Sequence, residues 1–240
     1  MTSIDSAAAL LHAASCISVL SGAGLSKASG IPTYRDTDGL WRDKNAVKFS
    51  HIDDLKRDPE GFHNFWASRM AALSAAKPNP GHRALVELQM HRPSTALITQ
   101  NVDGLLTDAG AQQIFELHGS LRRWRCDSCG NREEPWLSQC CPRCGAQARP
   151  DVVMFGEMLD EELLTRTQEV AAQNDVFLVV GTSAAVYPAA DLPTIAASNG
   201  AKIITLNMEA IDIDDIAAVV LRGCAEELLP DLIQTARLRP

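Results

Sequence analysis

Two cysteine pairs have the most informative spacing among the chemical groups of this sequence. Cys126 and Cys129, and Cys141 and Cys144, are each separated by two residues, and a glycine follows each pair. This gap lets both thiolates of a pair reach one ion, and the glycine accepts the left-handed turn after the second ligand. Four thiolates complete a tetrahedral site, so we expect a structural zinc ion held in a zinc ribbon. Cys140 falls outside this spacing.

A glycine-rich segment, residues 21–30 with the sequence SGAGLSKASG, follows a short apolar stretch. Its glycines permit close backbone approach, and the amides that follow can point at a pyrophosphate. Its third glycine comes later than in the usual dinucleotide-binding pattern, so a purely structural turn is the alternative. Arg35 lies shortly after it and offers a cation for phosphate.

Polar residues follow three other apolar stretches, at residues 99–104, 181–183 and 207–209. In open α/β sheets, ligands bind outside the carboxyl ends of the strands. We therefore expect residues 181–183 to line a nucleotide, and Asn207 or Glu209 to contact ribose hydroxyls.

His118, followed by a glycine, lies between this predicted crevice and the cysteine segment. A neutral imidazole at such a junction can serve as a general base. The remaining histidines fit helix or surface positions: His12, His51, His63, His82 and His91.

The elements that must position these groups follow from the apolar pattern. Stretches at 16–20, 95–98, 176–180 and 202–206 lack polar alternation, as expected for parallel strands buried on both faces. They alternate with helical patterns near 3–14, 81–91, 160–173, 188–199 and 225–237, which predicts a doubly wound, Rossmann-like parallel sheet. Residues 36–80, with a helix predicted over 59–76, and residues 120–150 depart from this rhythm. We expect them to form a smaller inserted domain, made of a helical module and the zinc ribbon.

Composition excludes several classes of protein. With 46% hydrophobic and 22% charged residues, the chain is neither collagen-like nor disordered. A net charge of −8 disfavours binding to the nucleic-acid backbone. The N-terminus lacks a basic region and the chain lacks a stretch of about 18 apolar residues, so we expect a cytoplasmic protein without membrane contact.

Taken together, these motifs resemble the sirtuin family from about Val19 to Pro230. The resemblance rests on GAGLSKASGIPTYR, TQNVDGL, LHGS, the paired cysteines, RPDVVMFGE, GTSAAVYPAA and LNME, which occur in the family's order. It implies NAD-dependent removal of acyl groups from protein lysines, which consumes NAD and yields nicotinamide, O-acyl-ADP-ribose and free lysine. The NAD-binding domain would comprise residues 1–35, 81–119 and 151–240.

The resemblance also implies roles for individual residues. His118 would be the base, Asn101 would align the nicotinamide ribose and the attacking group, and Asp103 would hold the carboxamide. The implied NAD contacts are Gly22, Ala23, Gly24, Arg35, Gln100, Asn101, Asp103, Gly181, Thr182, Ser183, Asn207, Glu209 and Cys224.

Substrate contacts are implied in two places. Residues 152–157 would pair with the substrate backbone as an added strand, with Val152, Val153, Met154 and Phe155 in contact. Trp66 and Arg69 are similar in spacing to the Tyr-x-x-Arg pair with which desuccinylases of this family read acidic acyl groups. The alternative is that both side chains merely pack the small domain, so we expect a deacetylase, with desuccinylation as the second reading.

Other functions remain open from the residues alone. A zinc-ribbon binding module without catalysis is one, although the acidic composition and the strand-end motifs disfavour it. A hydride-transferring dehydrogenase is disfavoured by the late third glycine. NAD hydrolysis and ADP-ribosyl transfer are minor alternatives within the sirtuin reading. The expected partners are acyl-lysine proteins or peptides.

Overall fold

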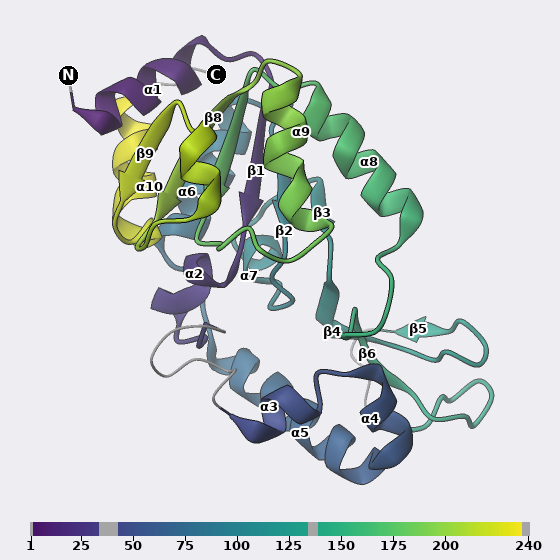
Figure 1. The fold of residues 1–240 in the computed structure, drawn as a ribbon. Coiled ribbons are helices and arrows are strands. Elements are labelled where there is room, and N and C mark those ends of the chain that lie inside the picture. Colours follow the sequence, from purple (N-terminus) through teal and green to yellow (C-terminus); the bar gives the residue numbers. More distant parts are fainter. Residues whose placement is uncertain (1, 34–42, 134–138, 237–240) are drawn as a thin grey trace.

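A computed structural model describes residues 2–33, 43–133 and 139–236. Within these ranges, six parallel strands form the main sheet, in the order β3-β2-β1-β7-β8-β9 (Figure 1). This order confirms the predicted doubly wound fold class. The strands are β1 (Ile17–Ser21), β2 (Ala96–Thr99), β3 (Ile114–Glu116), β7 (Val176–Val180), β8 (Lys202–Asn207) and β9 (Val219–Arg222).

Alternate side chains of the central strands pack into different cores. On β7, Leu178 and Val180 join a cluster with helices α1 (Ser3–Ala13), α6 (Pro80–His91) and α10 (Ala225–Thr235). Phe177 and Val179 face the opposite cluster, with α8 (Glu161–Ala172), η3 (Ala189–Asp191) and α9 (Leu192–Ser198). Because both faces are covered, every residue of β1, β2 and β7 is buried, which explains their continuous apolar sequences.

Local sequence signals set the starts of the long helices. The Asn79 side chain accepts hydrogen bonds from the first turn of α6, and Pro80 occupies a position where a missing N–H costs nothing. Asp58 and Pro59 begin α5 in the same way, and Asp160 caps α8. Most predicted helices therefore lie within one or two residues of those observed, whereas the helix predicted over 188–199 is divided into η3 and a shorter α9 that begins at Leu192.

The predicted helical module lies outside the main sheet. It contains α3 (Lys44–Lys48), α4 (Ile52–Arg57) and α5 (Pro59–Ala75). Phe49 and Phe62 of this module pack against Leu121, Val152 and Met154. The module is thus fixed to the segments that enter and leave the cysteine region.

Residues 119–152 contain a small antiparallel sheet in the order β5-β4-β6, although the sequence shows little regular pattern there. Its strands are β4 (Gly119–Arg125), β5 (Arg132–Glu133) and β6 (Arg149–Val152). One end of β4 adjoins His118 and the other adjoins Cys126, so this strand connects the two predicted sites. We call this sheet and its cysteine loops the ribbon.

The remaining short elements lie mainly at strand ends. They are α2 (Ala23–Ser26), η1 (Lys27–Ser29), α7 (Leu105–Asp108) and η4 (Asp212–Ile216). Across the described residues, each helix is too short or too polar to cross a membrane.

Candidate active site

The candidate active site lies where the connections after β1 and β7 leave neighbouring strands. The order of strands reverses between these two, which is where open α/β sheets form a ligand crevice. Gly22 and Gly24 follow β1, and Gly181 follows β7. The sequence thus places three glycines, which lack a side chain, at the topological switch point.

Contact between these two backbones requires the glycines. The Gly24 amide donates to the Gly181 carbonyl at 2.8 Å. A Cβ on Gly24 would lie 2.8 Å from the Gly181 Cα, a distance that side chains do not tolerate. The turn after β1 is therefore held directly against the β7 connection, with no side chain between them.

Gln100 bridges the carboxyl ends of three strands. Its backbone amide donates to Ser21 of β1 at 2.9 Å, and its side-chain amide donates to the Thr182 hydroxyl at 2.9 Å. Its backbone carbonyl accepts from Nδ1 of His118 at 3.0 Å. Because a carbonyl can only accept, the proton of the neutral imidazole resides on Nδ1. Nε2 of His118 therefore keeps a free lone pair.

The surroundings of His118 favour its neutral form. Burial lowers its pKa below the ordinary value, and the bond to Gln100 partly opposes this effect. Gly119 follows at a φ of 78°, and a Cβ there would lie 2.0 Å from the Asp151 carbonyl. The His118 carbonyl accepts from Val153 at 2.9 Å. The base candidate is thus fixed between the crevice and the segment after β6.

A buried polar network lies below the crevice, and three of its members, Ser26, Asn79 and His82, were not predicted as site residues. Asn101 donates to the Gly22 carbonyl at 3.0 Å and to the Ser26 hydroxyl at 3.2 Å. Ser26 donates to Asp103 at 2.7 Å and lies 3.3 Å from Nε2 of His82. Nδ1 of His82 accepts from the Asn79 amide at 3.3 Å.

His82 lies in α6, in line with the expected helix or surface position, and its ring is completely buried. Burial lowers its pKa to about 4, and nearby Arg83 adds to this effect. Burial also raises the pKa of Asp103, although the Leu105 amide and Ser26 partly offset it. The Asn79-x-x-His82 capping box at the start of α6 was the available signal, because it turns the His82 ring inward.

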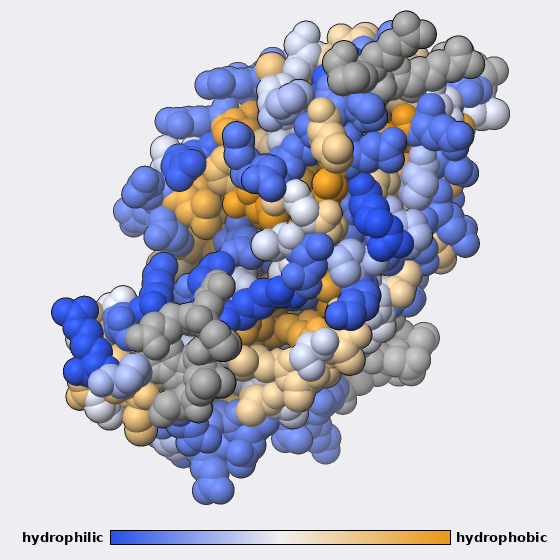
Figure 2. Space-filling model, turned by 180° about the vertical axis from the view of Figure 1, so that it is seen from behind, coloured by the Kyte–Doolittle hydropathy of each residue, from blue (hydrophilic) through white to orange (hydrophobic). Residues whose placement is uncertain are grey.

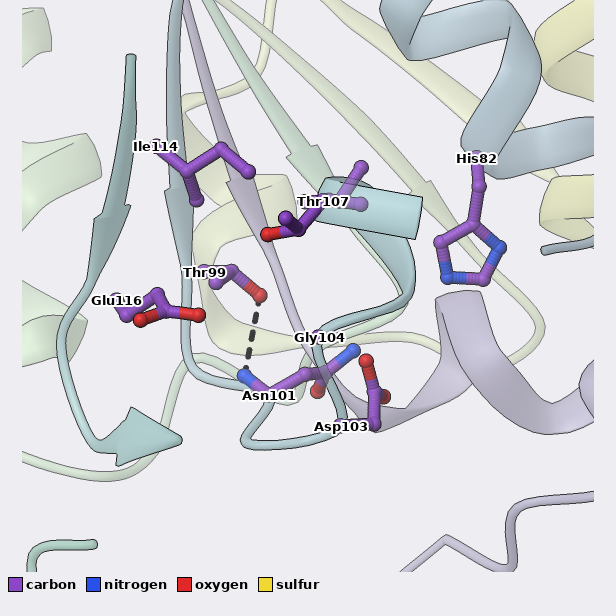
Figure 3. A pocket seen from close by; sticks show the side chains of 9 residues that line it. His82, Thr99, Asn101, Asp103, Gly104, Thr107, Ile114 and Glu116 are labelled. Atoms are coloured by element: carbon purple, nitrogen blue, oxygen red, sulfur yellow. Dashed lines mark hydrogen bonds between the residues drawn. The ribbon is translucent and has the colours of Figure 1, made fainter. Parts of the chain in front are cut away.

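A cavity of about 10 Å³ adjoins this network (Figure 3). Thr99, Asn101 and Glu116 line it, and the Thr99 hydroxyl accepts from the Asn101 amide at 3.1 Å. A space of this size holds about one water molecule when its lining is polar.

The next group of predicted NAD contacts follows strand β8. Asn207 is buried, and its Nδ2 is a buried donor with no partner among the described residues. Its carbonyl accepts from Gly223 at 3.2 Å, which brings Cys224 alongside. Glu209 is exposed, whereas Ala23 and Ser183 are half-buried. Arg35 lies outside the described residues.

Residues 152–155 alternate in exposure, as a strand should. Val152 and Met154 are buried in the core beneath the helical module, whereas Val153 is half-buried and Phe155 is 48% exposed. Phe155 donates to Ser50 at 2.9 Å, and its carbonyl accepts from Ile52 at 3.1 Å. Apolar surface is visible in the hollow between the larger and smaller parts of the molecule (Figure 2).

Trp66 and Arg69 lie on α5 with different surroundings. The Trp66 indole N–H donates to the Phe49 carbonyl at 3.1 Å, so this donor is already engaged. The Arg69 guanidinium lies 3.7 Å from Asp43 and 5.1 Å from the centre of the Phe65 ring. Arg69 and Asp43 line an open pocket on the helical module, whereas Trp66 is not part of its lining. Arg69 therefore remains the donor available to an acidic ligand.

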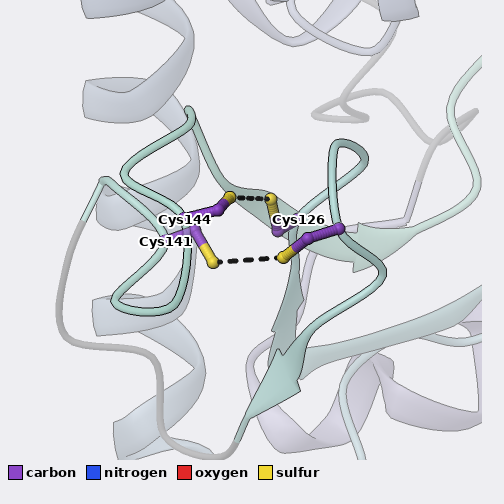
Figure 4. Close-up of side chains that lie close together, drawn as sticks. Cys126, Cys141 and Cys144 are labelled. Carbon is purple, nitrogen blue, oxygen red and sulfur yellow. Dashed lines mark hydrogen bonds between the residues drawn. The ribbon is translucent and has the colours of Figure 1, made fainter.

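The four predicted metal ligands converge in the ribbon (Figure 4). The Sγ atoms of Cys126, Cys129, Cys141 and Cys144 all lie within 4.8 Å of one another, and two pairs are 3.6 Å apart. A tetrahedral zinc with Zn–S bonds of about 2.3 Å needs sulfurs about 3.8 Å apart. The donor set therefore fits zinc, and the exposed Cys140 stays outside it.

The electrostatics of the cluster favour a bound cation. Burial raises the pKa of Cys141, but the amides of Cys144 and Arg143 outweigh it and lower the value to about 7. The Ala146 amide favours the Cys144 thiolate, yet Cys129, burial and other thiols raise the pKa of Cys144 to about 12. Four thiols this close do not all ionise unless a cation compensates their charge.

Known proteins with similar sequences share one description. The family model that matches, over residues 22–188, is described as the Sir2 family. NAD-dependent protein deacylases of Pyrococcus furiosus and Thermus thermophilus are 43% and 44% identical to the chain over 239 and 235 residues. These alignments cover 95% of this chain in both cases, and 96% and 92% of the relatives.

Solved structures agree with this description. A Sir2 homologue–NAD complex has a TM-score of 0.91 at 39% identity, over 97% of this chain and 93% of that chain. A structure described under the mechanism and regulation of Sir2 enzymes has a TM-score of 0.88 at 38% identity, over 99% of both chains. The likeness therefore extends over the sheet, the helical module and the ribbon.

Proposed function

The chain belongs to the Sir2 family, and we propose that it is an NAD-dependent protein-lysine deacylase, which yields nicotinamide, O-acyl-ADP-ribose and free lysine. One observation carries this proposal. His118 commits Nδ1 to the Gln100 carbonyl and keeps Nε2 free, between the glycine-lined crevice and the segment after β6. This is the position that a base serving both an NAD ribose and an acyl-lysine peptide requires.

The residues of the crevice fit NAD. When bound, NAD supplies a ribose carbon that accepts the acyl oxygen as nicotinamide leaves. Gly22, Gly24 and Gly181 would admit the pyrophosphate, because no side chain stands between their backbones. The unpartnered Nδ2 of Asn207 would donate to a ribose hydroxyl. Ala23, Thr182, Ser183, Glu209 and Cys224 complete the proposed contacts, together with Gln100 and Arg35.

Asn101 and Asp103 would orient the reacting end of NAD. The Asn101 side chain donates from Nδ2 to the Gly22 carbonyl and to Ser26, so its oxygen can align a ribose hydroxyl. Asp103 is held by Ser26 and the Leu105 amide, which fixes its carboxylate for the nicotinamide carboxamide. His118 would then take the proton from the ribose hydroxyl at Nε2.

The acyl group would enter below the helical module. The proposed contacts are Trp66 and Arg69 together with Val152, Val153, Met154 and Phe155. Because Asp43 already lies near the Arg69 guanidinium, an acidic acyl group has to compete with it. We therefore propose deacetylation as the main activity, with desuccinylation as a weaker one that depends on Arg69.

The ribbon would hold one structural zinc through Cys126, Cys129, Cys141 and Cys144. With four thiolates the coordination shell is closed, so the ion would serve folding rather than chemistry. In this proposal the sheet domain binds NAD, while residues 36–80 and 120–150 form the small domain.

The test is a panel of acetyl-, succinyl- and longer acyl-lysine peptides incubated with NAD and followed by mass spectrometry. We expect nicotinamide and deacylated peptide in equal amounts, with acetyl-lysine preferred. Release of nicotinamide without peptide turnover would instead indicate an NAD hydrolase. Arg69→Met should reduce desuccinylation and spare deacetylation; equal loss of both would show that Arg69 only packs the module.

A further inference from the structure

Arg149 is an unusual residue for a protein interior, because its side chain is only 1% exposed. Its guanidinium donates to three acceptors, one in the first cysteine loop and two in the segment after β6. Nε donates to Asp127 at 2.7 Å, one Nη donates to the Val152 carbonyl at 3.1 Å, and the other contacts Glu157. A planar guanidinium is suited to such a fixed, multidentate arrangement.

The first acceptor belongs to the metal-binding loop. Asp127 lies between Cys126 and Cys129, and it also receives Nε of Arg125 at 3.0 Å. Through these two hydrogen bonds, Asp127 ties the first cysteine loop to Arg149 and Arg125.

The other acceptors shape the segment after β6. One oxygen of Glu157 meets Arg149 and Arg125, and the other accepts from the Met154 amide at 2.9 Å. The Glu157 amide donates back to the Met154 carbonyl at 3.0 Å. Arg149 thereby fixes both ends of residues 152–157, at the Val152 carbonyl and at the Glu157 carboxylate.

This segment is the one that faces the peptide in the proposed function. Its first part is bonded to the His118 carbonyl through Val153, and its middle is bonded to Ser50 and Ile52 through Phe155. Arg149 touches none of the proposed NAD contacts in the hydrogen bonds of the described residues. A substitution at Arg149 should therefore weaken peptide binding more than NAD binding.

We propose that Arg149 is a positioning residue that links the metal-binding ribbon to the peptide-binding segment 152–157. This inference rests on the proposed function for its consequence, which is affinity for acyl-lysine peptides. In this arrangement the ribbon does more than stabilise the small domain, because it holds the shape of the strand that receives substrate.

The test compares Arg149→Lys, Glu157→Gln and a control, Arg132→Gln, in the full chain. Lysine keeps the charge but cannot reproduce the three-way fork. Arg132 is a matched ribbon arginine whose side chain is 59% exposed and lies 3.9 Å from Asp151. All three proteins are first checked for zinc content and NAD binding.

We expect Arg149→Lys to raise KM for an acetyl-lysine peptide by about tenfold or more, with KM for NAD and zinc content unchanged. Glu157→Gln should raise it by about threefold, since a neutral amide accepts from the Met154 amide more weakly than a carboxylate does. Arg132→Gln should match the wild type. If kcat falls in the Arg149 and Glu157 variants while peptide KM stays constant, Arg149 is merely structural and the proposal is overturned.

Hydrogen exchange supplies a readout that needs no turnover. Exchange of the Met154 amide should accelerate in Arg149→Lys and in Glu157→Gln, while β7 amides stay protected. Unchanged exchange at Met154 would overturn the positioning role. If the wild type deacylates no peptide, the proposed function fails, and this measurement still decides whether Arg149 shapes the segment. Should Arg149→Lys fail to fold, Glu157→Gln carries both measurements.

Discussion

The crevice and the ribbon are held together by different forces. The crevice is built from backbone contacts between glycines and from a buried network of hydrogen-bonded side chains around Ser26 and His82. The ribbon has a small buried cluster, with Trp124, Cys126, Cys141 and Ala148 at its centre. Ion pairs such as Arg149–Asp127 and Arg123–Glu116, both at 2.7 Å, surround it.

This difference has a physical consequence. The main sheet buries enough apolar surface to preorganise the crevice without any ion. The ribbon has a much smaller buried cluster, so in our proposal it relies on metal coordination and on paired charges. We therefore expect the loss of metal or of a charged group to affect the ribbon and peptide binding. Changes in packing or in the protonation of buried groups should instead affect the crevice.

The largest effect should come from the crevice. His118→Ala removes the only ring nitrogen assigned as a base, and we expect kcat for an acetyl-lysine peptide to fall by about 10²- to 10⁴-fold. NAD affinity, measured by calorimetry, should change little because the glycine backbones are untouched. A folded variant that retains wild-type turnover would remove His118 from its proposed role.

The matching perturbation of the ribbon is Cys129→Ser. We expect it to lose zinc and to unfold the ribbon, since thiolate coordination supplies much of the folding free energy of small metal sites. Metal analysis should find about one zinc per wild-type chain and almost none in the variant. Cys140→Ser is the control, because this exposed cysteine is outside the cluster. A metal-free variant with normal peptide turnover would contradict the comparison.

A change of pH should distinguish the crevice from the ribbon, because His82 belongs to the buried network of the crevice. Its pKa is about 4 in the folded protein and about 6.5 when unfolded, so the unfolded state binds more protons between these values. The contribution of His82 to stability is complete above pH 6.5 and is lost as pH falls toward 4, by about 3 kcal/mol.

In His82→Gln this part of the pH dependence should be absent. Denaturant unfolding of both proteins at several pH values measures it, and only the slopes against pH are compared. Parallel slopes would show that the His82 ring is not buried in the neutral form.

Two glycine substitutions should sharpen the contrast further. Gly24→Ala places a methyl group against the Gly181 backbone, and we expect a loss of about 1–3 kcal/mol in the free energy of unfolding, with weaker NAD binding. Gly130→Ala meets open space in the ribbon but forces a φ of 70°, which costs about 1 kcal/mol. It should affect zinc affinity and leave NAD binding unchanged. Weaker NAD binding in Gly130→Ala together with unchanged NAD binding in Gly24→Ala would contradict the comparison.

The smallest effect concerns the pH profile of turnover. Because His118 must be neutral to accept a proton and its pKa is lowered, kcat should fall only below pH 6.5. Between pH 7 and 8 we expect a change of less than about twofold. A half-maximal rate above pH 7 would mean that another group, or a charged partner of His118, controls the reaction.

Much of the architecture followed from local patterns. The buried strands at the sheet centre were predicted because two covered faces demand uninterrupted apolar residues, and the cysteine pairs because one ion fixes their spacing. The edge strands β3 and β9 were missed, since β3 has only two consecutive apolar residues and the apolar run at 216–221, which leads into β9, was not recognised as a strand. The roles of individual NAD and acyl contacts remain predictions.

What the sequence determined by itself is the fold class, the family and the types of chemical group available, because these depend on local periodicity and on ordered motifs. Only the tertiary structure decided which nitrogen of His118 is free and that His82 is buried beside Ser26. It also decided that the Trp66 indole N–H donates to the Phe49 carbonyl. Each of these facts depends on contacts between residues far apart in the chain, and hydrogen bonds between such segments leave no periodic trace in the sequence.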